Sequence, residues 1–263
     1  MPALIFDCDG VLADTERDGH RPAFNATFAE VGLPVQWSEQ EYGERLKIGG
    51  GKERMASLLT EAFVTTNGLP SEPGRQKQML ADWHRRKTTR YKELVRKGVL
   101  PARPGIARVV EEALAAGWTV AVASTSAEES VRAVLEHAVG ETNAARLAVF
   151  AGDIVAAKKP DPAIYLLTLD RLGLAAGDAI VVEDSRNGLL AAVGAGLRCV
   201  ITVSTYTQDE DFSEAILVVS SLGDPGEAAR VLANRGAGEP GELVTLADLD
   251  ACRTEPLSRK EAV

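Results

Sequence analysis

The second half of the chain alternates short apolar runs with longer segments of helical periodicity, and this alternation constrains the fold more than any other feature. The apolar runs lie at residues 119–123, 149–151, 179–182, 199–201 and 216–219, and helical segments such as 106–116 and 162–172 lie between them. Another apolar run, at residues 3–6, ends at Asp7. Strands that alternate with helices are typical of a parallel sheet covered on both faces. We therefore predict an α/β fold with a Rossmann-like parallel sheet, which the run at residues 3–6 joins.

Residues 15–98 differ from this pattern, because they show helical periodicity and no clear strand signal. Apolar residues at 24, 28 and 31 fall on one helical face, and Ser38 with Glu41 has the pattern of a capping box. Segments 52–66 and 75–97 are predicted as further helices. This block is therefore predicted to be an all-helical insertion after the first strand.

These patterns predict a discontinuous core domain from residues 1–15 and 99–225, with a helical domain at residues 16–98. Residues 226–263 form a C-terminal extension to which we assign no role. Its apolar positions suggest short helices; they are Val231, Leu232, Leu243 and Leu246.

Composition excludes several classes of protein. The chain has 263 residues, of which 45% are apolar and 25% charged, as in ordinary globular domains. Its net charge of 29 − 38 = −9 argues against a nucleic-acid partner. No stretch approaches the roughly 18–20 apolar residues of a membrane span, and the N-terminus lacks the pattern of a signal peptide. We expect a cytoplasmic protein with no membrane partner, monomeric, with Cys8, Cys199 and Cys252 as reduced thiols.

Two carboxylates follow the first predicted strand, in the sequence Asp7-Cys8-Asp9-Gly10. Ligands of open parallel sheets bind at the carboxyl ends of the strands. There, one carboxylate can act as a nucleophile and the other as a general acid and base. The alternative is a pair of aspartates that only satisfies backbone donors in a turn.

Three further polar groups follow other predicted strands. The hydroxyls of Ser124, Thr125 and Ser126 can bind a phosphoryl oxygen, although residues of this type also cap helices. Lys159 can hold phosphate beside clustered carboxylates, or can lie in solvent before a helix that starts with proline. Glu183 and Asp184 supply oxygen ligands suited to Mg²⁺, or an acidic helix cap. Four such groups in one order favour a phosphoryl-transfer site.

This motif set, taken in order, resembles that of the haloacid dehalogenase superfamily of aspartyl-phosphate hydrolases, over residues 3 to about 205. The helical insertion resembles the cap domain of one subgroup. By this resemblance, Asp7 is the nucleophile and Asp9 the acid–base residue, and Ser124 and Lys159 bind the reacting phosphate. The resemblance also implies a Mg²⁺ site made by Asp7, the backbone carbonyl of Asp9, Glu183 and Asp184.

The helical insertion carries an excess of basic residues. Residues 75–97 have nine basic and two acidic side chains, so that their net charge is 9 − 2 = +7. The basic ones are Arg75, Lys77, Arg85, Arg86, Lys87, Arg90, Lys92, Arg96 and Lys97. Gly49-Gly50-Gly51 precedes Lys52 and Arg54, and glycines before a helix expose N–H groups to anions. The ordinary interpretations are a solvated helix face and a flexible turn. The sharper one is a site for a second anionic group of the substrate.

A wider pattern resembles the CbbY subgroup of this superfamily. It comprises 14–16, 18–20, 42–44, 49–55, 150–153 and 159–165. Members of that subgroup dephosphorylate xylulose 1,5-bisphosphate, a by-product that inhibits Rubisco of the Calvin cycle. The resemblance implies that Glu16 holds substrate hydroxyls and that residues 124–130 flank the reacting phosphate. It also implies a distal-phosphate site; its residues are Gly50, Gly51, Lys52, Glu53 and Arg54 with His84, Arg85, Arg86 and Lys87. His20 is a further candidate for substrate binding.

We therefore predict a Mg²⁺-dependent sugar phosphatase whose substrate is most simply xylulose 1,5-bisphosphate. Three alternatives remain open: a sugar phosphomutase resembling β-phosphoglucomutase, a phosphoglycolate phosphatase, and a non-catalytic module that binds a sugar phosphate or a partner.

Overall fold

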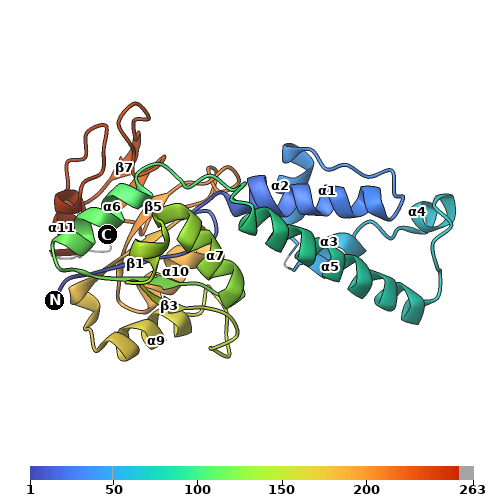
Figure 1. Cartoon of the computed structure of the whole chain (residues 1–263), viewed down its shortest axis with the longest axis horizontal. Coiled ribbons are helices and arrows are strands. Elements are labelled where there is room, and N and C mark those ends of the chain that lie inside the picture. Colours follow the sequence, from blue (N-terminus) through green and yellow to red (C-terminus); the bar gives the residue numbers. More distant parts are fainter. Residues whose placement is uncertain (49, 255–263) are drawn as a thin grey trace, which may run out of the picture. The chain divides into compact units, whose positions relative to one another are not determined.

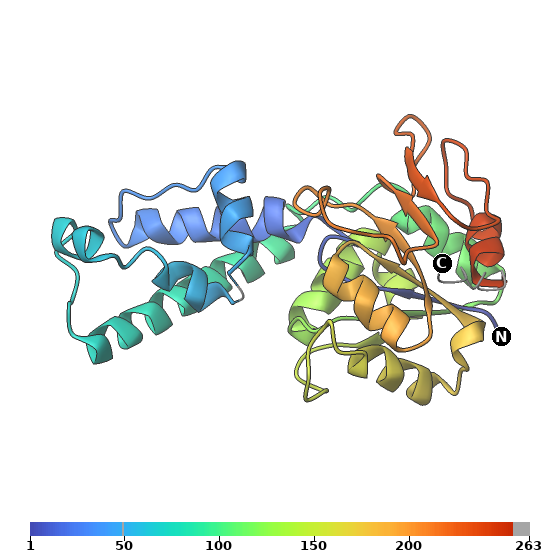
Figure 2. The same ribbon diagram turned by 180° about the vertical axis from the view of Figure 1, so that it is seen from behind.

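The computed structural model describes residues 1–48 and 50–254. These residues form two compact units (Figures 1 and 2). The core unit consists of residues 1–14 and of the chain from Pro101 onward, and the cap unit consists of Thr15–Leu100. Residues 226–254, to which the sequence assigned no role, belong to the core unit. Residues 255–263 of the predicted extension lie outside the described residues.

The core unit is built on one seven-stranded sheet with the order β3-β2-β1-β4-β5-β6-β7. Six strands are parallel, which confirms the predicted α/β fold with a Rossmann-like parallel sheet. They are β1 (Ala3–Phe6), β2 (Thr119–Ala123), β3 (Ala148–Phe150), β4 (Ala179–Glu183), β5 (Arg198–Thr202) and β6 (Leu217–Val219). Each forms within two residues of a predicted run, because buried strands of a parallel sheet have continuous apolar sequences.

The last strand, β7 (Val231–Asn234), corrects the expectation of short helices throughout the C-terminal extension. It pairs antiparallel with β6 at the edge of the sheet. Val231 and Leu232 are largely exposed, and a strand of four residues that is apolar but not buried has no periodicity to distinguish it from a helix. The helix α11 (Leu246–Thr254) does form in this segment.

Helices cover both faces of the sheet (Figures 1 and 2). On one face lie α9 (Ala163–Leu172) and α10 (Arg186–Gly194), which bury Tyr165 and Leu189 against the central strands. On the other lie α6 (Ile106–Ala115), α7 (Glu128–Val139) and α11. Short helices at Glu141–Ala144 (α8) and Ala176–Asp178 (η2) complete the unit. All residues of β1 and β4 are buried, so the sheet places their C-terminal ends on a rigid support.

The described elements of the cap unit are all helical. They are η1 (Glu16–His20), α1 (Arg21–Glu30), α2 (Glu39–Leu46), α3 (Gly51–Ala56), α4 (Glu61–Thr66) and α5 (Pro73–Arg96). Phe24, Phe28, Trp37 and Tyr42 pack as one aromatic cluster, with ring centroids 4.8–6.2 Å apart. The predicted capping box is confirmed, because the Ser38 and Glu41 side chains and backbones bond reciprocally at the start of α2.

The single helix predicted over residues 52–66 is instead two short helices, α3 and α4. The Ser57 hydroxyl donates to the carbonyl of Arg54, and the Thr60 side chain accepts from the Phe63 N–H and so caps a new helix. Hydroxyl side chains that bond to nearby backbone groups compete with a continuous helix. The helical face predicted from residues 24, 28 and 31 is also shorter than expected, because α1 ends at Glu30 and Val31 is the residue after it.

No helix within the described part of the chain is both long enough and apolar enough to cross a membrane. Cys8, Cys199 and Cys252 are buried and form no disulfide with one another.

Candidate active site

The loop after β1 presents Asp7 and Asp9 at the carboxyl end of the sheet. The Asp7 N–H donates to the carbonyl of Val182 on β4, which continues the strand pairing by one residue. Gly10 turns the chain with φ at +77°. A Cβ at Gly10 would lie 1.9 Å from a carboxylate oxygen of Asp184, so glycine is required here for the close approach of that side chain.

Lys159 links two of the predicted carboxylates. Its ammonium nitrogen lies 2.6 Å from Asp7 Oδ1, 2.6 Å from Glu183 Oε1 and 3.2 Å from the carbonyl oxygen of Ala123. Its side chain is only 10% exposed, so the interpretation as a solvated lysine is wrong. Burial by itself lowers the pKa of Lys159, but the charges of Asp7 and Glu183 outweigh it and raise that pKa above the ordinary value. Lys159 therefore stays protonated.

Three carboxylates converge beside this lysine. Oxygens of Asp7, Glu183 and Asp184 all lie within 4.8 Å of one another, and all three residues are buried. Burial, together with the neighbouring carboxylates, raises the pKa of Asp184 well above its usual range. Burial also raises the pKa of Asp7 to about 7, against the opposing effect of Lys159.

The donor set of this cluster fits a divalent cation. Three carboxyl groups supply hard oxygen ligands of the kind that suits Mg²⁺, and Lys159 pairs with two of them, Asp7 and Glu183. A cation bound there would replace the protons that burial favours on Asp7 and Asp184. Asp9 is not part of the cluster through its side chain. Its carboxylate instead accepts a hydrogen bond from the Ser126 hydroxyl.

The loop after β2 carries the predicted phosphate-binding hydroxyls. The Ser124 N–H donates to the carbonyl of Phe150. The buried hydroxyl of Ser124 accepts from the Ser126 N–H at 3.2 Å. Thr125 lies between them and is half-buried. None of the three caps α7, whose N-cap residue is Ala127, so the alternative of an ordinary helix cap is wrong for this segment. Contacts to Lys159 and Asp9 join this loop to the carboxylates.

In the cap unit, Glu16 and Arg54 meet through Tyr42. The Tyr42 hydroxyl donates to Glu16 at 2.6 Å, and a guanidinium nitrogen of Arg54 lies 3.2 Å from that hydroxyl and 3.6 Å from the other Glu16 oxygen. Arg54 also donates to the carbonyl of Ile48. Gly50, with φ at +93°, precedes α3, and the Glu53 carboxylate lies close against it. Lys52 is exposed beside them, and Gly49 lies outside the described residues.

A second group of predicted residues surrounds Lys87. Its ammonium nitrogen lies 2.6 Å from His20 Nδ1 and 4.6 Å from the centroid of the Phe24 ring. Lys87 is only 6% exposed. The His84 ring approaches Gly51 so closely that a Cβ there would lie 2.9 Å from Nε2. Burial, with the charges of Lys87 and Lys52, lowers the pKa of His84.

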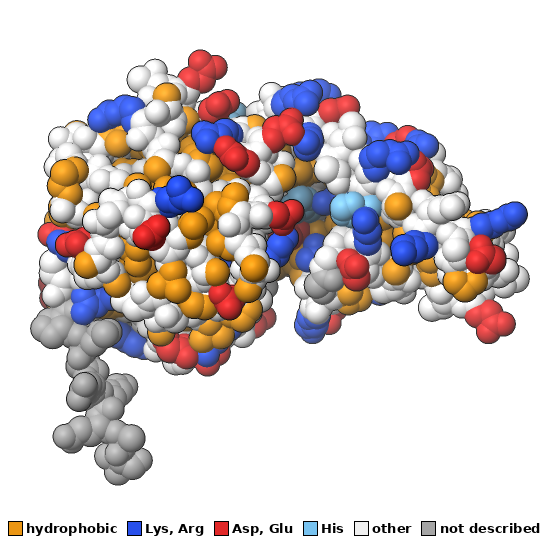
Figure 3. Space-filling view, turned by 90° about the horizontal axis from the view of Figure 1, so that it is seen from below, with side chains coloured by type: hydrophobic (Ala, Val, Ile, Leu, Met, Phe, Trp, Pro, Cys, Tyr) orange, Lys and Arg blue, Asp and Glu red, His pale blue; other side chains and the backbone are white. Residues whose placement is uncertain are grey.

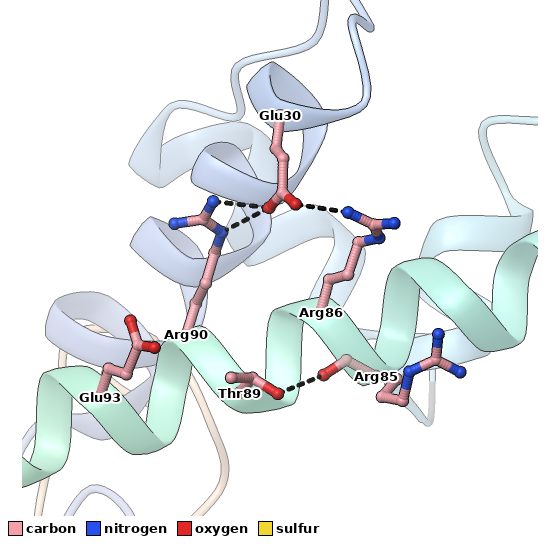
Figure 4. A pocket seen from close by; sticks show the side chains of 6 residues that line it. All are labelled: Glu30, Arg85, Arg86, Thr89, Arg90 and Glu93. Atoms are coloured by element: carbon pink, nitrogen blue, oxygen red, sulfur yellow. Dashed lines mark hydrogen bonds and ion pairs between the residues drawn. The ribbon is translucent and has the colours of Figure 1, made fainter.

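Arg85 and Arg86 are placed differently. Both guanidinium groups pair with Asp82, and Arg86 pairs also with Glu30, which accepts from Arg90 as well. Figure 4 shows Glu30, Arg85, Arg86 and Arg90 among the residues that line a pocket, with Arg86 and Arg90 directed toward Glu30; the pocket has a volume of about 300 Å³. Basic and acidic side chains are also interspersed over the surface drawn in Figure 3. Arg85 and Arg86 are therefore already paired with carboxylates within the cap unit.

Sequence reasoning missed three residues that contact predicted site residues or the loop that carries Asp7 and Asp9. Tyr165 donates to Glu183, and Tyr42 joins Glu16 to Arg54. Arg103 donates to the carbonyls of Gly10, Thr202, Val203 and Ser220, and so ties together the loops that follow β1, β5 and β6. Tyr42 and Tyr165 lie inside segments 42–44 and 159–165, which carry the resemblance to the CbbY subgroup, but neither residue has a motif of its own.

Comparison with known proteins identifies the family. A family model of haloacid dehalogenase-like hydrolases matches residues 1–196, which include Asp7, Ser124, Lys159 and Asp184. The chain belongs to the haloacid dehalogenase-like hydrolases. The predicted resemblance to this family is thereby confirmed, and so is the prediction that the chain is an enzyme, a hydrolase of the phosphatase type.

Within these hydrolases the chain is similar to CbbY proteins over most of its length. It is 48% identical to a CBBY-like protein of Arabidopsis thaliana, over 86% of this chain and 70% of that protein. It is 43% identical to the plasmid CbbY protein of Cupriavidus necator, over 86% and 88% of the two. The predicted membership of the CbbY-like group is thus confirmed.

The fold agrees with a solved CbbY structure. That of CbbY from Rhodobacter sphaeroides in complex with phosphate superposes with a TM-score of 0.72 at 38% identity, over 95% of this chain and 99% of that one. A mutant of the same protein was crystallised with xylulose-(1,5)bisphosphate, and it matches this chain with a TM-score of 0.72 at 37% identity.

Proposed function

We propose that this haloacid dehalogenase-like hydrolase is a Mg²⁺-dependent sugar phosphatase that converts xylulose 1,5-bisphosphate to xylulose 5-phosphate and phosphate. The observation that carries the proposal is the contact of 2.6 Å between Lys159 and Asp7, beside the carboxylates of Glu183 and Asp184. A carboxylate nucleophile next to a permanent cation is the arrangement that phosphoryl transfer to an aspartate needs. The complex of a CbbY mutant with xylulose-(1,5)bisphosphate supports the choice of sugar.

In the first step of the proposed reaction, an oxygen of the Asp7 carboxylate attacks phosphorus, and the bond between phosphorus and the sugar oxygen breaks. Asp9 donates its proton to the departing sugar oxygen. In the second step Asp9 takes a proton from water, whose oxygen attacks the phosphorus of the aspartyl phosphate. The bond between phosphorus and the Asp7 oxygen breaks, which releases inorganic phosphate and restores the Asp7 carboxylate. The Ser126 hydroxyl, which donates to Asp9, orients that carboxylate toward this exchange.

Lys159 and the hydroxyl loop at 124–126 would hold the phosphoryl oxygens during both steps. Ser124 and Ser126 come from the loop whose Ala123 carbonyl accepts from Lys159, so the two groups are held together. When bound by Asp7, Asp184, Glu183 and the Asp9 carbonyl, Mg²⁺ supplies positive charge that offsets the repulsion between carboxylates and phosphate.

We assign the distal phosphate to the cap unit. Arg54 and Lys52 supply positive charge beside the N–H groups of Gly50 and Gly51, and His84 and Lys87 belong to the neighbouring helix. Glu16, with its carboxylate held by Tyr42 and Arg54, is proposed to bind sugar hydroxyls, and His20 to support Lys87. Arg85 and Arg86 are the weaker members of the predicted set, because Arg85 is already paired with Asp82, and Arg86 with Asp82 and Glu30.

A phosphate-release assay tests the proposal. The protein with Mg²⁺ is given xylulose 1,5-bisphosphate, ribulose 1,5-bisphosphate, β-glucose 1-phosphate, phosphoglycolate and an aryl phosphate, with Asp7→Asn as the blank. We expect one phosphate per xylulose 1,5-bisphosphate consumed, with kcat/KM at least about tenfold above that for the ribulose isomer. Isomerisation of β-glucose 1-phosphate without release of phosphate would establish a mutase instead, and preferential turnover of phosphoglycolate would overturn the assignment of the sugar.

A further inference from the structure

Lys159 is held at the centre of the site by its side-chain contacts. It lies in the loop between β3 and α9, outside any regular element. Its ammonium group donates to Asp7, Glu183 and the carbonyl of Ala123, which uses all three of its protons. On a further side, the ring centroid of Tyr165 lies 4.9 Å from the nitrogen.

Tyr165 contacts both members of the Lys159–Glu183 pair. It is a fully buried residue in the first turn of α9, and its hydroxyl donates at 2.6 Å to Glu183 Oε1, the same oxygen that accepts from Lys159. Its ring faces the ammonium group at a distance typical of cation–π contacts. One side chain thus interacts with the cation through its ring and with the anion through its hydroxyl.

We infer that Tyr165 is a positioning residue, which holds the Lys159 ammonium and the Glu183 carboxylate in the geometry that phosphoryl transfer to Asp7 requires. This inference rests on the proposed function, in which Lys159 binds the phosphoryl group. When Asp7 accepts that group, it ceases to be a full anionic partner of Lys159, and Glu183 remains. Because Glu183 Oε1 divides its lone pairs between Lys159 and Tyr165, the Lys159 proton that Asp7 gives up can turn to the phosphoryl oxygens. Without the tyrosine hydroxyl, the buried carboxylate has one donor fewer and draws Lys159 toward itself.

Gly188 supplies a second observation. It lies in the first turn of α10, where a side chain would otherwise favour the helix. A Cβ at this position would lie 2.0 Å from the carboxylate carbon of Glu183. The chain therefore keeps Gly188 free of a side chain where Glu183 is held between Tyr165 and Lys159.

The test compares Tyr165→Phe with Thr168→Val as a matched control. Both remove one buried hydroxyl from α9, but Thr168 donates only to the carbonyl of Ile164 within the helix. We expect Tyr165→Phe to lower kcat about ten- to a hundredfold on sugar bisphosphate and aryl phosphate alike, with KM changed less than about threefold. Binding of orthovanadate in the presence of Mg²⁺, measured by calorimetry, should weaken about tenfold. Thr168→Val should leave kcat and vanadate affinity within twofold of the wild type.

Two outcomes overturn the inference: kcat and vanadate affinity of Tyr165→Phe within twofold of the wild type, or equal losses in Thr168→Val. Gly188→Ala, which displaces the Glu183 carboxylate from the other side, should lower both kcat and vanadate affinity, as Tyr165→Phe does. If the wild type hydrolyses no phosphate ester, the proposed function fails, and the vanadate titrations still decide the role of Tyr165. Absence of vanadate binding by the wild type overturns that role.

Discussion

The charged residues of the candidate active site in the core unit are held differently from the ion pair of Arg86 and Glu30 in the cap unit. In the core unit, Lys159 bonds to Asp7 and Glu183 with side-chain exposures of 10%, 11% and 1%. In the cap unit, the pair of Arg86 and Glu30 is 44% and 32% exposed. A buried charge without a partner is costly, whereas an exposed pair contributes little. The difference teaches that the fold fixes the charges of Lys159, Asp7 and Glu183, whereas the charges of Arg86 and Glu30 are ordinary surface charges.

The largest expected effect is that of Asp7→Asn, which tests the core side of this comparison. Removing the nucleophile should lower kcat by about four orders of magnitude or more on both bisphosphate and aryl phosphate. Because burial raises the pKa of Asp7 to about 7, the neutral amide should fold as well as the acid, which thermal unfolding would check. Turnover within a hundredfold of the wild type would show that another group attacks phosphorus.

Metal and protons should compete for the same buried carboxylates. Asp7 and Asp184 have raised pKa values in the folded protein, so between about pH 4 and pH 7 the folded state holds protons that the unfolded chain has released. In the absence of metal, the contribution of Asp7 and Asp184 to the free energy of unfolding therefore falls as the pH rises through this range. Since Mg²⁺ displaces these protons, its apparent affinity should fall roughly tenfold per pH unit below 7 for each proton released.

This dependence is measured as the shift of Tm between EDTA and Mg²⁺ at pH 5.5 and at pH 8. We expect the larger shift at pH 8. Equal shifts at the two pH values would mean that the metal does not bind through Asp7 and Asp184.

The core side of the comparison was predictable from sequence, because buried strands are continuous apolar runs and the residues that end them meet at one edge of the sheet. Asp7, Ser124, Lys159 and Asp184 all follow such runs. Tyr165 was not predictable from spacing, since a tyrosine in the first turn of an apolar helix looks like core packing. Its role depends on the side-chain contacts of Glu183, which no sequence period encodes.

The cap side was predictable only as a zone of positive charge. Successive residues of an α-helix point about 100° apart, so neighbours in sequence face different surroundings. Lys87 is buried on the face of α5 that also carries Trp83, Tyr91 and Val95, whereas the adjacent Arg86 lies on the exposed face with Arg90. A basic run therefore predicts the charge of a helix, but the packing of its faces decides which side chains can bind a ligand.

An intermediate effect is expected from Arg54→Gln, which tests whether the largely buried Arg54 of the cap unit binds the distal phosphate. Loss of a charge-assisted hydrogen bond to the distal phosphate, about 1.5–3 kcal/mol, should raise KM for the bisphosphate about 10- to 150-fold. The KM for an aryl phosphate should change less than about twofold, since that substrate has no distal phosphate. Arg75→Gln, the same change at an exposed position of the cap unit, is the control. Equal losses on both substrates would contradict a distal-phosphate role for Arg54.

The smallest effect is expected from Arg86→Gln, which tests whether an exposed, paired arginine of α5 takes part in substrate binding. Arg86 is bonded to Glu30 and Asp82, and hydrogen bonds from Arg90 and Arg86 lower the pKa of Glu30, so these charges are satisfied by one another. We expect KM for the bisphosphate within about twofold of the wild type and Tm lowered by less than about 3 °C, because exposed ion pairs contribute little. Since Arg90 still pairs with Glu30 in this variant, the surface network is only partly lost. An increase in KM comparable to that of Arg54→Gln would contradict this, and would mean that Arg86 exchanges its carboxylate partners for the substrate's phosphate.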